Sequence, residues 1–268
     1  MSETSGEIPF WEREVTELPP ERVKIGIDTC KQIATTIQEK TGITSAVSKI
    51  LVREGRVPEG YIGVSIFPKK LGLSSSYNQE VKEGVILLPD GFWTEREGIE
   101  TVAHEETHLI LDSSFREIGD GKIRRPVTEG ICDLVALEVT DELLGQDKTL
   151  QIIEARAAYY QDFRGKQEEV NDYFAKPLES LTSEEVPTND TPKEIDHIIG
   201  RRFVYSLRLA NPSINIRDFI NCLLLDSPTR EELVNPDKYE PKLRSYEPRQ
   251  TKASPIDIIV TDKPERII

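Results

Sequence analysis

The spacing of apolar residues separates a short region with strand-like patterns from a longer region with helical patterns. In residues 21–42, Ile33 and Ile37 lie four apart among polar residues, which predicts a helix that ends near Gly42. Three short apolar runs rich in β-branched residues come next, and each predicts a strand. These runs are 50–52, 61–67 and 84–89.

From residue 94 to about 226 the pattern is mainly helical, with an interruption near 183–192. Thr94 and Glu97 have the spacing of a capping box, a local signal for the start of a helix. The helix that follows carries apolar residues on one arc, and this arc is its expected core face. These residues are Ile99, Ala103 and Ile110.

These elements predict an α+β fold, with a small mixed sheet followed by a mainly helical half. We expect a flexible arm at 1–20, one domain at 21–226 and a C-terminal extension at 227–268. The extension holds six of the seventeen prolines, so we expect it to be extended or disordered and to wrap the domain or bind a partner.

Residues 104–108 read His-Glu-Glu-Thr-His, the H-E-x-x-H pattern of a zinc site with a carboxylate base. Residues four apart on a helix lie about 40° apart around its axis, so His104 and His108 point the same way. Both lie off the expected core arc and could face a cleft, with Glu105 within reach of a water at the metal. The alternative is a solvated helix that carries two surface histidines.

A catalytic zinc site normally takes three protein ligands and leaves one position for water. Leu111 and Ser114 occupy the glycine and histidine positions of the variant with a third histidine, which excludes that variant. Glu129, twenty-one residues after His108, is a candidate third ligand, or else an ordinary acidic residue. Pro126 suits the first turn of its helix. An apolar set at helical spacing continues this helix: Ile131, Leu134 and Val135.

The segments HEETH and TEGICDLVA resemble the gluzincin group of zinc metallopeptidases, especially its peptidase-MA-like members, with H-E-x-x-H followed by E-G-x-x-[DE]. The resemblance implies zinc bound by His104, His108 and Glu129, and a small sheet leading into the metal-binding helix. It also implies that Asp133 supports His104, a contact that would fix the tautomer of the imidazole. The alternative for Asp133 is an exposed helix charge.

The third histidine, His197, begins the segment His-x-x-Gly-x-x-Phe-Val, where related peptidases often have tyrosine in the first position. A histidine there could donate a hydrogen bond to the oxyanion of a tetrahedral intermediate. The alternative is a partly buried structural histidine. Cys132, one turn beyond Glu129, is a further residue near the expected metal, and a small buried hydrophobe is the favoured interpretation.

The formal charge of −14 argues against nucleic acid and anionic membranes as partners and would favour a basic peptide segment as substrate. No apolar run has the length of a membrane span, and the first ten residues lack the features of a signal peptide. Three widely spaced cysteines are consistent with free thiols in a reducing compartment. We therefore expect a cytoplasmic protein, with its oligomeric state open.

The expected activity is zinc-dependent hydrolysis of peptide bonds in a peptide or protein, with Glu105 as general base. Endopeptidase action is preferred, because the chain has no Gly-x-Met-x-Asn segment of the kind that anchors a free amino terminus in related aminopeptidases. The strand at 84–88 is either an edge that pairs with an extended substrate or an inner strand. Two alternatives are a repressor-cleaving regulatory protease and a catalytically silent binding or scaffold module.

Overall fold

The structure is a computed structural model that describes residues 20–43, 45, 49–54, 64–66, 83–88, 96–160, 167–175, 193–247 and 258–261. Within these ranges the chain forms nine helices and four strands. Residues 1–19 of the expected arm at 1–20 lie outside the described residues, and Pro20 is the first residue of a helix. Thr94 of the expected capping box and the interruption near 183–192 also lie outside the described residues.

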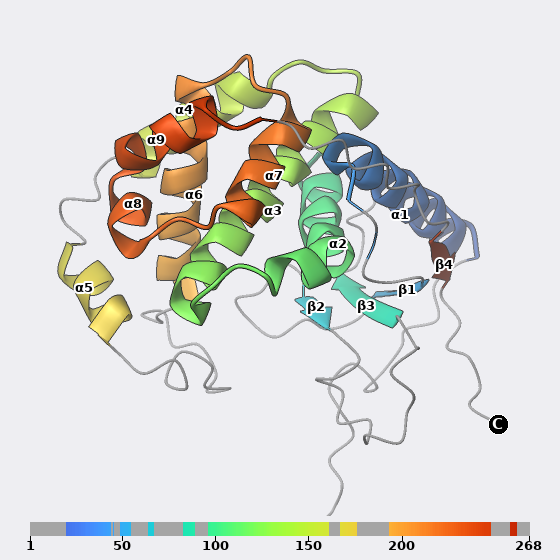
Figure 1. The fold of residues 1–268 in the computed structure, drawn as a ribbon. Coiled ribbons are helices and arrows are strands. Elements are labelled where there is room, and N and C mark those ends of the chain that lie inside the picture. Colours follow the sequence, from blue (N-terminus) through green and yellow to red (C-terminus); the bar gives the residue numbers. More distant parts are fainter. Residues whose placement is uncertain are drawn as a thin grey trace, which may run out of the picture.

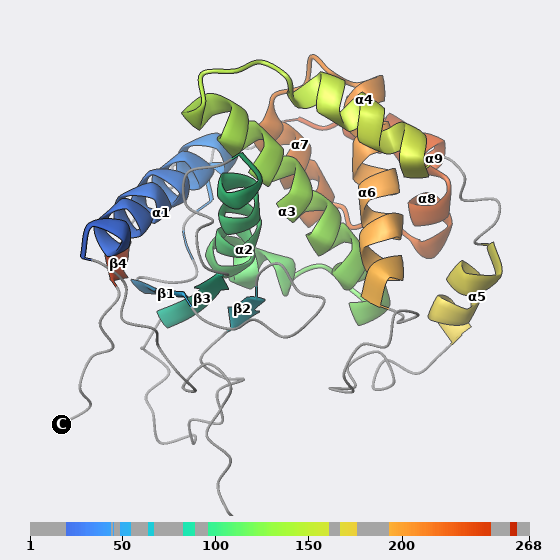
Figure 2. The same ribbon diagram turned by 180° about the vertical axis from the view of Figure 1, so that it is seen from behind.

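The four strands form one mixed sheet at the lower edge of the molecule (Figures 1 and 2). They are β1 (Lys49–Glu54), β2 (Val64–Ile66), β3 (Glu83–Leu88) and β4 (Ile259–Thr261), in the order β2-β3-β1-β4. Strand β1 is parallel to β3 and β4, whereas β2 is antiparallel to β3. Helices α1 (Pro20–Thr41) and α2 (Arg96–Phe115) lie over this sheet.

The predicted α+β class with a sheet-forming half is wrong. Of the residues whose side chains are described, 80% are helical and 2% lie in strands. Strands occur at the three predicted places, but they are only three to six residues long. The chain therefore builds a helical body to which a small sheet is attached.

Of the two interpretations of the strand at 84–88, the structure supports the inner strand, because β3 lies between β2 and β1. The two edges of the described sheet are β2 and β4.

The helical body is built around α3 (Gly121–Leu143), with α6 (Lys193–Ala210) packed along it (Figure 2). Further helices complete the body: α4 (Thr149–Tyr160), α5 (Gln167–Ala175), α7 (Ile216–Leu225), α8 (Arg230–Val234) and α9 (Pro236–Arg244). One apolar core runs through the body, and α3 contributes many of its buried residues. The predicted helices at 21–42 and from 94 to about 226 are confirmed for the described residues in those ranges.

The expectation of extended or disordered chain after residue 227 is wrong for 230–244, which form α8 and α9. Leu233, Tyr239 and Leu243 are almost completely buried in the same core as α3 and α6. The Tyr239 hydroxyl donates to the Asp226 carbonyl at 2.6 Å, which ties α9 to the end of α7. Strand β4 then pairs with β1, so residues 259–261 join the sheet formed by the strands that precede α2.

Candidate metal centre

One face of the helix α2 packs into the core. Ile99, Ala103 and Ile110 are at most 7% exposed, which confirms the predicted core arc. The side chains of His104 and His108 lie off this arc and are 13% and 14% exposed. The core packing of α2 therefore presents both imidazoles on a different side of the helix.

The two residues between Glu105 and His108 face the protein interior. Glu106 and Thr107 are completely buried, and the Thr107 hydroxyl donates to the Ala103 carbonyl at 2.6 Å. Burial raises the pKa of Glu106 well above its ordinary value, because a buried carboxylate loses its hydration. Of the two adjacent glutamates, Glu105 is thus the one that retains some exposure, at 8%. It forms no hydrogen bond or ion pair with the described part of the chain.

Helix α3 begins earlier than predicted, at Gly121, with Asp120 as its N-cap. Pro126 therefore lies inside the helix and not in its first turn. Proline lacks the N–H that would bond to the carbonyl four residues earlier, which belongs to Lys122. The Tyr173 hydroxyl donates to this carbonyl at 3.2 Å and replaces the missing partner.

The backbones of α3 and α6 touch where two glycines face each other. A Cβ atom on Gly200 would lie 1.9 Å from the Pro126 carbonyl oxygen, and one on Gly130 would lie 2.4 Å from the Gly200 oxygen. Only glycine permits this approach. It places Glu129 and Asp133 of α3 beside His197 and Arg201 of α6.

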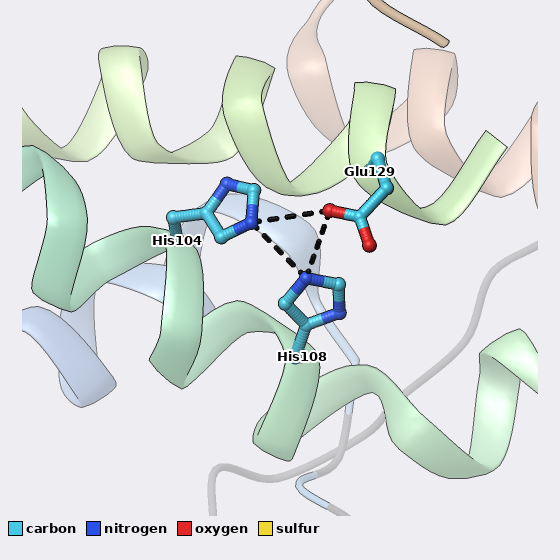
Figure 3. A group of neighbouring side chains, drawn as sticks. All are labelled: His104, His108 and Glu129. Carbon is cyan, nitrogen blue, oxygen red and sulfur yellow. Dashed lines mark hydrogen bonds and ion pairs between the residues drawn. The ribbon is translucent and has the colours of Figure 1, made fainter. Parts of the chain in front are cut away.

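Three candidate ligand atoms from α2 and α3 converge on one point (Figure 3). The Nε2 atoms of His104 and His108 are 3.1 Å apart, and each lies 3.3 Å from Oε2 of Glu129. Phe115 packs edge-on against the His108 ring, with the centroids 6.3 Å apart. The structure thus brings the three residues predicted as ligands into one group that could hold a metal ion.

Asp133 lies directly behind His104. Its Oδ1 is 2.9 Å from Nδ1 of His104, so the carboxylate accepts the Nδ1–H and leaves Nε2 as the lone-pair donor. Asp133 is buried and is also bonded to the guanidinium of Arg201, through Nε to Oδ2 and through Nη2 to Oδ1 at 3.2 Å. Arg201 was not predicted from the sequence. It lies four residues after His197 and so on the same side of α6, which is the signal that could have identified it.

His197 lies at the margin of the group. Its Nδ1 is 3.5 Å from Oε2 of Glu129, and its ring centroid is 6.0 Å from that of His104. This nitrogen is buried and makes no hydrogen bond with the described residues. His197 does not belong to the set of mutually close ligand atoms, so the geometry places it beside the centre.

Burial and charge act in opposite directions on the ionisable groups of the site. Burial lowers the pKa of His104, but the carboxylates of Asp133 and Glu129 raise it by more, so it lies well above its ordinary value. Burial raises the pKa of Glu129, but the nearby histidines lower it by more, so it lies well below its ordinary value. For His197, burial outweighs the nearby carboxylates and lowers the pKa, which favours the neutral imidazole.

Cys132 is completely buried in the core, in agreement with its interpretation as a small hydrophobe. Burial raises the pKa of its thiol well above the ordinary value, and the carboxylates of Glu129, Asp133 and Glu105 raise it further. Among the described residues, Cys132 does not belong to the group of mutually close candidate ligand atoms. All three cysteines are free, as expected, and all three are buried.

The spacing of the donor atoms suits a tetrahedral metal ion. Bonds of about 2.0–2.1 Å in a tetrahedron put neighbouring ligand atoms roughly 3.3 Å apart. The observed separations are 3.1 to 3.3 Å. With three protein ligands, the fourth corner is left for a water or a substrate.

Comparison of the chain with protein-family models, with curated proteins and with solved structures finds no significant match in any of the three. The resemblance to gluzincins is therefore carried by the motif residues. Among the described helices, none combines the length and the apolar character needed to cross a bilayer.

Proposed function

We propose that the chain is a gluzincin-type zinc peptidase that hydrolyses peptide bonds in a peptide or protein substrate. One observation carries the proposal: three ligand atoms from His104, His108 and Glu129 lie at tetrahedral spacing, with Glu105 next to the first ligand. Two imidazoles and one carboxylate form a donor set typical of catalytic zinc sites.

The chemistry supplied by a bound zinc ion is the activation of a water molecule and the polarisation of the scissile carbonyl. Glu105 would act as the general base, accepting a proton at its carboxylate from the attacking water and returning it to the departing amine. Its freedom from hydrogen bonds and ion pairs with the described residues supports this role, because no partner has to be displaced first.

His197 is the proposed donor to the oxyanion. A neutral imidazole can donate one hydrogen bond, and the buried Nδ1 beside Glu129 has no other acceptor among the described residues. A donor fixed in place before the reaction stabilises the developing charge without reorganisation.

An extended substrate that pairs with the sheet would add to β2, an edge strand that is antiparallel to β3 and lies near α2. The proposed substrate-binding strand is therefore β2 and not β3, which is an inner strand. Endopeptidase action, a basic substrate segment and a cytoplasmic location remain proposals. The negative charge of the chain supports a basic substrate segment. The three free thiols support a cytoplasmic location.

The test is cleavage of a diverse peptide library by the zinc-loaded wild type and by Glu105→Gln, with products identified by mass spectrometry. We expect cleavage by the wild type and its loss in the variant at equal zinc content. If the wild type binds zinc and cleaves no peptide, the peptidase proposal fails and a binding module becomes the better interpretation.

A further inference from the structure

The ion pair between Arg201 and Asp133 joins α6 to the metal-binding helices. Arg201 bonds to both oxygens of Asp133, and the same Oδ1 accepts the Nδ1–H of His104. A continuous chain of contacts therefore runs from the guanidinium on α6, through a carboxylate on α3, to an imidazole on α2.

Because Asp133 is buried, its carboxylate depends on the ion pair with Arg201. Its side chain is 7% exposed, so the carboxylate loses most of its hydration and needs fixed donors to remain charged and oriented. Two contacts from a planar guanidinium also restrict rotation of the carboxylate, which a single contact from a lysine does not.

We propose that Arg201 is a positioning residue of the metal centre, which holds Asp133 in the orientation that aims Nε2 of His104 at the zinc ion. This proposal rests on the proposed zinc site. It gives α6 two roles at the centre, since His197 on the same face lies beside Glu129. A group that orients a ligand through hydrogen bonds typically changes metal affinity by about 10- to 100-fold when it is removed.

The test is the zinc dissociation constant of the full chain, measured by competition with a chelating dye. Arg201→Met should weaken zinc binding by about tenfold, and Arg201→Lys by less, because lysine keeps the charge but not the double contact. In a protein that already carries Asp133→Asn, Arg201→Met should cause little further loss of zinc affinity, because Arg201 acts through the Asp133 carboxylate.

The chain offers a matched control in Arg208, which also joins α6 to α3. Its Nη2 lies 3.1 Å from Oε1 of Glu138, two helical turns from Arg201. Arg208→Met should lower the thermal stability of the metal-free protein and leave zinc affinity unchanged. An equal loss of zinc affinity in Arg208→Met and Arg201→Met would show general loosening of the helix pair and would overturn the proposal.

Unchanged zinc affinity in Arg201→Met, or an equal loss with and without Asp133→Asn, would also overturn it. If Arg201→Met does not fold, Arg201→Lys decides, and wild-type zinc affinity in that variant refutes the role of the double contact. A wild type that binds no zinc refutes this proposal and the proposed function together. If the variants show the predicted zinc affinities but the wild type cleaves no peptide, the proposed peptidase function is refuted and the role of Arg201 is retained.

Discussion

Replacing Gly200 with alanine should force α3 and α6 apart where their backbones touch. The new Cβ would lie 1.9 Å from the Pro126 carbonyl oxygen, whereas ordinary contact begins at 3.4 Å. The helices must therefore separate locally by up to 1.5 Å, the difference between these two distances. Because both atoms are fixed to helical backbone, no change of rotamer can relieve the contact.

Overpacking of this kind costs about 1–3 kcal/mol, and we expect the upper end here. Alanine returns up to about 1 kcal/mol through its better helix propensity. The net loss in free energy of unfolding is then about 2 kcal/mol, which corresponds to a fall in melting temperature of roughly 4–8 °C for a domain of this size. Zinc binding should weaken as well, because the same helix contact positions Arg201 behind Asp133.

The assay is chemical denaturation of the metal-free protein, followed by zinc titration. Gly119→Ala is the matched control, since a Cβ there meets nothing within 4 Å. It should change the free energy of unfolding by less than about 0.5 kcal/mol. The explanation based on close helix packing is refuted if Gly200→Ala unfolds like Gly119→Ala.

Three further predictions concern the site and its surroundings. Glu105→Gln should retain zinc and lower kcat by about 10²- to 10⁴-fold, measured on any peptide that the wild type cleaves. His197→Phe should also retain zinc and reduce kcat more than it changes KM, as judged by steady-state kinetics, because its hydrogen bond forms with the transition state. Burial raises the pKa of Asp196 to about 6 despite its ion pair with Arg125, so the native state keeps a proton that the unfolded state has released. Stability of the metal-free protein should therefore contain a component that falls as pH rises from about 4 to 6, by up to roughly 3 kcal/mol, and Asp196→Asn should remove it in denaturation curves taken across this range.

The predicted ligands could be recognised because their geometry is largely local. The helical repeat alone places His104 and His108 on one side of α2, and the apolar arc of Ile99, Ala103 and Ile110 sets which side faces the core. Glu129 was a candidate from its spacing to His108 and from the resemblance, but periodicity alone could not identify it, because its meeting with the histidines depends on how α2 and α3 pack.

The contribution of α6 could be predicted only in part. His197 was chosen as a chemical candidate, but Arg201 was passed over, because a tertiary ion pair leaves no mark in local periodicity. The i, i+4 spacing of His197 and Arg201 on α6 matches that of Glu129 and Asp133 on α3. This shared spacing would have suggested that His197 lies opposite Glu129 and that Arg201 lies opposite Asp133.

The errors in the fold have physical causes. The strand-like runs do form strands, but their length was too small to support an α+β class. Strand order is a tertiary property, so β3 could not be recognised as an inner strand. In the C-terminal region the prolines suggested extended chain, yet Pro236 lies at the start of α9, where proline is favoured. Tyr239 and Leu243, four apart, form the buried face of that helix.

The most direct test of the account is a calorimetric titration of the metal-free protein with zinc, with His108→Ala measured beside the wild type. We predict that the wild type binds one zinc ion per chain and that His108→Ala loses this binding, because two ligands remain of the group formed with His104 and Glu129. A wild type that binds no zinc, or a variant that binds it with the same stoichiometry and affinity, would contradict the proposed metal centre.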